Sequence, residues 1–253
     1  MLLKNNRRNF VKNAAIGTLA AIAIPDIITS AYATERSKKA VLEQNDVVLF
    51  QGDSFTEWGR DKNKNLPNDF GSLGSGYVLL TATEVLRDYA GKNLQIYNKG
   101  ISGNKVFQLA DRWDTDTIAI KPNVLSIMVG VNDYWHTVTS GYKGTIETYR
   151  TDYKKLLERT QQALPSVKLI IGESFAMKNV KAVDDSWYPA FDNYRQVARD
   201  MADEFGAAFI PYQSVMDEAL KLAPATYWSI DGVHPTPAGA SLMAQAWLKA
   251  VKG

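Results

Sequence analysis

Short apolar runs alternate along the chain with longer stretches in which apolar residues recur at helical spacing. The first run, VVLF at residues 47–50, is bounded by polar residues and glycine, as a buried strand is. Four similar runs follow. We therefore expect strands at 46–50, 94–98, 124–129, 167–171 and 207–210.

Helices are predicted between these strands. The clearest is 144–163, where apolar residues form one stripe and Pro165 follows the last turn. The others are expected at 77–90, 105–119, 189–205, 213–222 and 237–251. Repeated strand–helix alternation predicts an α/β fold, with a mostly parallel sheet covered by helices on both faces. No internal repeat divides the chain, so we expect one domain over residues 46–253, preceded by a polar lead-in over 34–45.

Residues 1–33 follow a different pattern. They begin with basic residues, continue through an apolar stretch at 14–24 and end on the small-residue motif AYA, the order of a cleaved export signal. The Arg7-Arg8 pair resembles a twin-arginine signal, which a receptor for folded proteins reads. The apolar stretch is far shorter than the ~20 residues of a membrane-spanning helix. We therefore expect no stable membrane anchor, recognition by the twin-arginine export machinery, cleavage after Ala33, and a periplasmic or secreted product.

Composition narrows the possible chemistry. The chain has 253 residues, 45% hydrophobic and 22% charged, which is enough for one domain with a sizeable core. Its net charge of +2 is not clustered on the predicted domain, so no nucleic-acid partner is expected. The chain has no cysteine and two histidines, which argues against disulfides, thiolate catalysis and a catalytic zinc. The GSLGSG stretch at 71–76 lacks the Gly-Lys-Ser/Thr of a phosphate loop. We expect no metal and no organic cofactor.

Candidate chemistry lies in the loops. Ligands of parallel α/β sheets bind beyond the carboxyl ends of the strands, where the loops gather. Four such segments carry glycine and polar residues: GDS at 52–54, NKGISGNK at 98–105, GVNDYWH at 130–136 and SIDGVHPTPAG at 229–239. Each one alone is ordinary turn chemistry, but together they contain the parts needed for acyl transfer.

Ester hydrolysis needs a nucleophile, a base, a group that orients the base, and donors for the oxyanion. Ser54 directly follows a predicted strand, whereas Ser102 and Ser174 are not placed on a comparable turn. The base is one of two histidines.

Both histidines have an aspartate three residues upstream, so spacing alone does not choose between them. His234 has Asp231, and His136 has Asp133. Asn132 lies where an oxyanion donor is wanted, next to Asp133, and this position favours the His234–Asp231 pair as base and orienter.

In their order and in their spread over residues 52–234, the four segments resemble the four sequence blocks of the SGNH, or GDSL, hydrolase family. The leucine that gives the family its name is Phe55 here, at a position without a chemical role. The resemblance implies a flavodoxin-like three-layer α/β/α sandwich with five parallel strands. It implies Ser54 as nucleophile, His234 as base and Asp231 as its orienter. The implied oxyanion donors are the backbone N–H groups of Ser54 and Gly103 and the side-chain amide of Asn132.

The segments FQGDSFTEWGRD, NKGISGNKVFQLADRW and YWSIDGVHPTPAGASLMAQAWL are similar to those of bacterial carbohydrate esterases, including acetylxylan esterases. Together with the expected export signal, this similarity implies an exported serine esterase. It would remove short acyl groups, above all O-acetyl groups of carbohydrates, through an acyl-enzyme. The alternatives are a lysophospholipase or thioesterase on the same scaffold, and a catalytically silent glycan-binding protein. A homo-oligomer is left open.

The remaining candidates are pocket residues. Asp53 is expected to anchor the turn before the nucleophile. Trp135 and His136 are candidates to line the substrate pocket, with ordinary packing as the alternative, and so is Trp228 because it lies close to Asp231 in sequence. Two further loop aromatics, Trp187 and Tyr188, are equally well explained as buried anchors.

Overall fold

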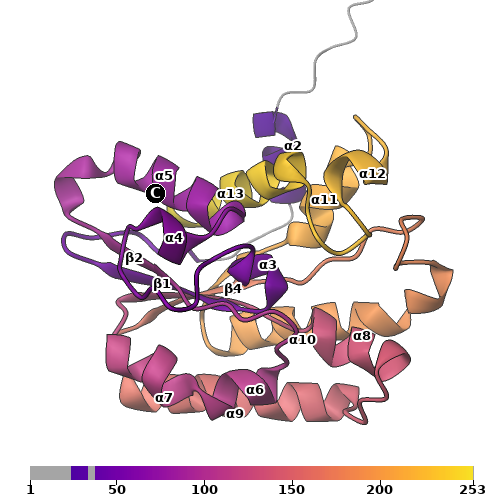
Figure 1. The fold of residues 1–253 in the computed structure, drawn as a ribbon, viewed down its shortest axis with the longest axis horizontal. Coiled ribbons are helices and arrows are strands. Elements are labelled where there is room, and N and C mark those ends of the chain that lie inside the picture. Colours follow the sequence, from indigo (N-terminus) through magenta and orange to yellow (C-terminus); the bar gives the residue numbers. More distant parts are fainter. Residues whose placement is uncertain (1–23, 34–37, 253) are drawn as a thin grey trace, which may run out of the picture.

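The fold is built around one parallel sheet (Figure 1). The computed structural model describes residues 24–33 and 38–252. Its five strands are β1 (Val47–Gly52), β2 (Gln95–Asn98), β3 (Val124–Met128), β4 (Lys168–Gly172) and β5 (Ala208–Ile210), in the spatial order β2-β1-β3-β4-β5. All neighbours are parallel, with Phe50 of β1 opposite Asn98 of β2 and Ser126 of β3. The five predicted strands are confirmed.

Helices cover both faces of the sheet, so the three-layer α/β/α arrangement is confirmed (Figure 1). The layer drawn above the sheet contains α2 (Ile24–Ala31), α4 (Phe70–Leu73), α5 (Tyr77–Asp88), α11 (Tyr212–Ala219), α12 (Ala225–Trp228) and α13 (Pro237–Val251). The layer below contains α6 (Val106–Asp111), α7 (Trp113–Asp116), α8 (Val131–Thr139), α9 (Ile146–Ala163) and α10 (Ala190–Glu204). The one-turn helix α3 (Ser54–Glu57) follows β1, and three 3₁₀ turns span Ala90–Lys92, Ile118–Ile120 and Asp185–Trp187.

Two sequence expectations need correction. The single helix expected at 105–119 is divided into α6 and α7 at Arg112, whose backbone leaves helical geometry while its side chain binds the neighbouring loops. The segment 130–136, which we expected to be a loop, is mostly the start of α8. Val131 and Tyr134 of that segment are buried at i, i+3 spacing, a helical signal that its glycine and polar residues obscured.

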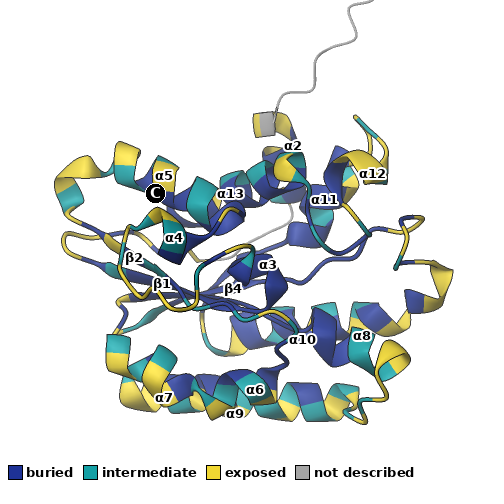
Figure 2. Cartoon of the chain, viewed as in Figure 1, coloured by how far each residue is buried: buried dark blue, intermediate teal, exposed yellow. Residues whose placement is uncertain are grey.

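The core lies between the sheet and the two helical layers, while the outer sides of the helices are exposed (Figure 2). Phe50 in the interior strand β1 packs against Trp247 of α13, with ring centroids 5.1 Å apart. The indole N–H of Trp247 donates to Ser126 Oγ of β3 at 3.0 Å, so this buried polar group has a partner. These contacts fix the strands whose ends carry the candidate chemistry.

Helix α2 comes from the end of the predicted export signal and packs on the domain. Ile27, Ile28 and Ala31 are buried in the hydrophobic core, and the Tyr32 hydroxyl donates to the Ala246 carbonyl at 2.9 Å. Residues 1–23, which hold the basic start and most of the apolar stretch, lie outside the described residues. No helix within the described part of the chain is long and apolar enough to cross a membrane.

Candidate active site

Ser54 lies at the point where β1 turns into α3. Gly52 ends the strand so close to β3 that a Cβ atom on it would lie 2.2 Å from the Met128 carbonyl oxygen. Asp53 caps the helix, since its Oδ1 accepts a hydrogen bond from the Phe55 N–H at 3.1 Å. Ser54 therefore begins a single helical turn at the carboxyl end of β1.

His234 approaches Ser54 from a tight turn near the C-terminus, 180 positions further along the chain. Its Nε2 lies 2.9 Å from Ser54 Oγ, and its Nδ1 lies 2.7 Å from Asp231 Oδ2. The other carboxylate oxygen, Oδ1, accepts the backbone N–H groups of Val233 at 2.9 Å and His234 at 2.8 Å. The turn thus holds the imidazole edge-on between a carboxylate and a hydroxyl.

These hydrogen bonds keep Asp231 ionised. Partial burial alone would raise the pKa of Asp231, but the hydrogen bonds from the His234 ring and from the His234 and Val233 backbones outweigh it and lower the pKa to about 2. A carboxylate on Nδ1 favours the tautomer that carries its proton there. Nε2 is then free to accept the proton of the Ser54 hydroxyl.

The three predicted oxyanion donors come from three segments: Ser54 begins α3, Gly103 lies in the loop after β2, and Asn132 lies in α8. Gly103 has φ +78°, a left-handed conformation that glycine adopts without strain. Among the hydrogen bonds of the described residues, the backbone N–H groups of Ser54 and Gly103 have no acceptor. Asn132 is buried in the first turn of α8, and its Nδ2 donates to the Asn104 carbonyl, next to Gly103, at 3.3 Å. The other Nδ2 proton is available for a ligand.

The second histidine, His136, is not the one that meets Ser54. Its ring lies beside Gly103, with Cε1 3.9 Å from the point that a Gly103 Cβ atom would occupy. Partial burial and the nearby Lys105 lower the pKa of His136, which favours its neutral form. His136 therefore lies next to the loop that carries Gly103, and the hydrogen bonds of the described residues do not join it to Ser54.

Asp53 and Asp133 are buried below the site. Asp133 Oδ1 accepts the backbone N–H of Val106 at 3.2 Å, so this side chain braces the start of α6 as Asp53 braces the start of α3. Burial raises the pKa of each carboxyl to about 7. Both residues hold backbone turns in place.

Aromatic rings surround the imidazole. The ring centroid of His234 lies 6.1 Å from that of Trp135 and 5.4 Å from that of Trp58. Trp187 supports Trp135 at 5.6 Å. Trp58 was missed in the sequence, although it lies only four residues after Ser54.

Trp228 has a different place from Trp135. Its indole N–H donates to the Ala223 carbonyl at 3.2 Å, and its ring packs edge-on against Tyr227. Its backbone carbonyl accepts the Thr236 N–H at 2.9 Å, so Trp228 supports the turn that carries His234.

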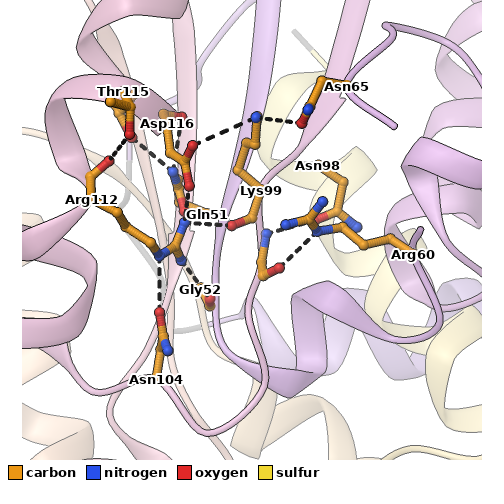
Figure 3. A network of polar contacts seen from close by, with 12 residues as sticks. Gln51, Gly52, Arg60, Asn65, Asn98, Lys99, Asn104, Arg112, Thr115 and Asp116 are labelled. Carbon is orange, nitrogen blue, oxygen red and sulfur yellow. Dashed lines mark hydrogen bonds and ion pairs between the residues drawn. The ribbon is translucent and has the colours of Figure 1, made fainter. Parts of the chain in front are cut away.

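Arg112 joins the end of β1 at Gly52 to the loop that follows β2 (Figure 3). Its guanidinium donates to Asn104 Oδ1 at 2.9 Å, to the Lys99 carbonyl at 2.8 Å and, at the longer distance of 3.4 Å, to the Gly52 carbonyl. Asp116 Oδ2 holds the same guanidinium at 2.9 Å. Sequence reasoning gave Arg112 no role, because nothing in its local pattern shows that it faces two remote loops.

No group of three or more His, Cys, Asp or Glu side chains in the described part of the chain is arranged to hold a metal ion.

Comparison with known proteins places these features in a family. Residues 50–242 match the model of the GDSL-like lipase/acylhydrolase family. An acetylxylan esterase of Geobacillus stearothermophilus is 32% identical over 206 residues, covering 81% of this chain and 93% of that protein. Its solved structure has a TM-score of 0.75 at 30% identity, covering 83% of this chain and 96% of that one.

Two further structural results are relevant. A GDSL-like lipase from Parabacteroides merdae has a TM-score of 0.83 at 52% identity, covering 84% of this chain and 98% of that one. Solved catalytic mutants of the Geobacillus esterase replace a serine, a histidine and an aspartate by alanine.

Proposed function

Because the chain belongs to the GDSL-like lipase/acylhydrolase family and is a carboxylic ester hydrolase, we propose that it removes short acyl groups, above all O-acetyl groups of carbohydrates, with Ser54, His234 and Asp231. The observation that carries the proposal is the unbroken chain of contacts from Ser54 Oγ to His234 Nε2 at 2.9 Å and from His234 Nδ1 to Asp231 at 2.7 Å. The acetylxylan esterase of Geobacillus, with its catalytic serine, histidine and aspartate, supports the substrate class and the three roles.

In the first half of the proposed reaction, Ser54 Oγ attacks the acetyl carbonyl carbon while His234 Nε2 takes the hydroxyl proton. The carbonyl oxygen becomes an oxyanion. The donors placed to receive it are the N–H groups of Ser54 and Gly103 and the amide of Asn132. When the tetrahedral intermediate collapses, His234 returns the proton to the departing sugar oxygen and the acetyl group stays on Ser54.

In the second half, His234 takes a proton from water, and the water oxygen attacks the acetyl-Ser54 ester. Collapse releases acetate and restores the Ser54 hydroxyl. Asp231 stays ionised throughout and stabilises the imidazolium that forms twice per turnover. Trp58 and Trp135 offer flat apolar faces beside the imidazole, which suits a sugar ring or a small acyl group better than a charged substrate.

Acetate release from acetylated xylan and acetylated xylo-oligosaccharides tests this proposal. We expect Ser54→Ala to reduce turnover by about 10⁶-fold, as removal of a catalytic serine does, and to abolish covalent labelling by a phosphonate ester. Xylan from which the acetyl groups have been removed serves as the substrate control. A Ser54→Ala protein that released acetate at the parent rate would overturn the assignment.

A second candidate, a lipase-type acyl hydrolase, is favoured by the name of the Parabacteroides relative. Rates on p-nitrophenyl esters from acetate to palmitate separate the two. Rates that fall steeply beyond the shortest chains support the carbohydrate deacetylase, and rates that rise with chain length support the lipase.

We also propose that the chain is exported through the twin-arginine machinery and cut after Ala33, on the strength of the order of residues 1–33. N-terminal sequencing of the protein recovered outside the cytoplasm tests this, with Arg7→Lys/Arg8→Lys as the variant expected to stay inside.

A further inference from the structure

Glu57 ends helix α3, one turn after Ser54, and binds the loop that follows β2. Its Oε2 accepts a hydrogen bond from the backbone N–H of Ser102, the residue before Gly103. Glu57 is buried, and its other carboxylate oxygen pairs with the exposed Lys62 at 3.2 Å. The last residue of the nucleophile helix is thus in direct contact with the segment that carries the second oxyanion donor.

The same helix holds this loop at a second point. Gly100 lies so close to α3 that a Cβ atom on it would be 2.4 Å from the Glu57 backbone nitrogen. Just after the helix, Arg60 Nε donates to the Gly100 carbonyl at 2.8 Å (Figure 3). Because the loop is attached to α3 at Gly100 and at Ser102, the positions of Ser54 and Gly103 are coupled through one rigid turn.

Gly103 itself is held by its neighbours rather than by packing. Among the described residues, and beyond its chain neighbours, one atom lies within 4 Å of a Cβ placed on Gly103: His136 Cε1, at 3.9 Å. On the far side, Asn104 is fixed by Arg112, Asn132 and the Ile101 carbonyl. On the near side, the contact that fixes Ser102 N–H is Glu57. The direction of the Gly103 N–H therefore depends on hydrogen bonds to the residues on both sides.

The charge of Glu57 strengthens this contact. Burial alone would raise the pKa of Glu57, but hydrogen bonds from the Ser102 side chain and backbone, together with Lys62, outweigh it and lower the pKa. An ionised acceptor makes a shorter and stronger hydrogen bond with an N–H group than a neutral one.

We propose that Glu57 is a positioning residue for ester hydrolysis: its carboxylate, through Ser102 N–H, aims the Gly103 N–H at the oxyanion formed on Ser54. The inference depends on the proposed function, in which Gly103 is an oxyanion donor. Glu57 does not touch the substrate, so its removal should lower kcat by misplacing a donor and leave substrate binding nearly unchanged.

Three substitutions separate the effect of side-chain length at position 57 from the effect of its charge. Glu57→Ala removes the acceptor, Glu57→Gln keeps a neutral oxygen at the same reach, and Glu57→Asp keeps the charge but withdraws it by one methylene. We expect kcat for p-nitrophenyl acetate to fall about 10²-fold in Glu57→Ala, the size of an error of about 1 Å in placement. We expect a fall of roughly 10-fold in Glu57→Gln, with Glu57→Asp close to Glu57→Ala and KM within about twofold in all three.

If Glu57 acted only in folding, Glu57→Asp would retain more activity than Glu57→Gln, because aspartate keeps the buried charge paired with Lys62 and glutamine does not. The proposal is overturned if Glu57→Asp retains as much kcat as Glu57→Gln, or if Glu57→Ala stays within about twofold of the parent. Should Glu57→Ala fail to fold, the order of the Gln and Asp variants decides. Thermal unfolding by circular dichroism accompanies each rate, and kcat is expressed per folded protein.

Two controls complete the experiment. Lys62→Ala removes the exposed partner of Glu57 while leaving the Ser102 contact, and should stay within about threefold of the parent kcat. Ser54→Ala in the same assay detects failure of the proposed function, which appears as turnover independent of Ser54. Failure of the present inference appears instead as Ser54-dependent turnover that is insensitive to Glu57.

Discussion

Two histidine–aspartate pairs with identical spacing behave differently in this protein. In the turn of residues 231–234, the Asp231 carboxylate binds two backbone N–H groups and the imidazole of His234. In α8, the Asp133 carboxylate binds the backbone of α6, and His136 lies over Gly103.

The difference shows that a three-residue spacing allows an aspartate–histidine contact without requiring it. The side chain pairs with whichever donors the backbone places nearest. In the C-terminal turn these are the N–H groups of the next residues, which draw the ring onto the same carboxylate. In α8 the aspartate is turned into the core. The helix contributes an amide, Asn132, to the candidate site in place of a base.

Replacing the two histidines one at a time tests this comparison most strongly. His234→Ala should lower kcat by about 10⁶-fold, as loss of a triad base does. His136→Ala should change kcat less than about tenfold, since among the described residues the Ser54 hydroxyl is hydrogen-bonded to His234 and not to this ring. Steady-state rates on p-nitrophenyl acetate measure both. Near-parent activity of His234→Ala would reverse the assignment of the base.

The aspartates give the next largest contrast. Asp231→Asn should cost about 10⁴-fold in kcat, because an amide in place of the carboxylate favours the wrong tautomer of His234. Asp133→Asn keeps an oxygen for the Val106 N–H and should stay within about tenfold of the parent. The same assay applies, with thermal unfolding as the control for folding. Equal losses of kcat in the two variants would contradict the different roles given to Asp231 and Asp133.

The pH dependence of stability gives the smallest and sharpest contrast. Burial raises the pKa of Asp133 from its ordinary 3.8 to about 7, so the native state binds a proton that the unfolded chain loses above pH 4. Its contribution to the free energy of unfolding is complete below pH 4 and is lost as the pH rises to about 7. Asp231, with a pKa lowered to about 2, has the opposite sign: its contribution is complete above pH 4 and is lost as the pH falls toward 2.

Urea unfolding of the parent and of Asp133→Asn at pH 5 and pH 7 measures the first effect. We expect the variant to gain of order 2 kcal/mol relative to the parent over this interval, from about 1.4 kcal/mol per pH unit for one group. Asp53 titrates in the same direction, and because the Asp133 charge helps to raise its pKa, its contribution cancels only in part in the difference. Parallel free energies at the two pH values would contradict the assignment to Asp133.

Much of the fold was predictable, because strands and long helices are determined by periodicity within a short window. The five strands and the helix at 237–251 are found where apolar spacing placed them. The break at Arg112 was not predictable in this way. It depends on a guanidinium that reaches the Asn104 side chain and the Lys99 and Gly52 carbonyls, and these lie on segments that only the completed fold brings together.

The candidate site divides in the same manner. Residues in the four sequence blocks were identifiable because their types and order carry chemistry. Trp58 and Glu57 belong to the first block but were passed over, since a tryptophan beside an imidazole and a glutamate on a distant N–H group have no local signature. Trp228, which its closeness in sequence to Asp231 suggested as a pocket residue, has its ring against Tyr227, and its place in a pocket stays a prediction.

Because helix α2 packs on the domain, the residue at which the protein starts affects its stability. Ile27 and Ile28 belong to the same continuous core as the sheet, yet they precede the point at which an export signal is expected to be removed. Burial of one such isoleucine is worth roughly 1.5–3 kcal/mol. A protein prepared from residue 34 exposes to solvent the sides of α11 and α13 that α2 covers, whereas a protein prepared from residue 24 keeps them buried. Solubility and melting temperature therefore need to be compared between two start points before either is taken as a property of the enzyme.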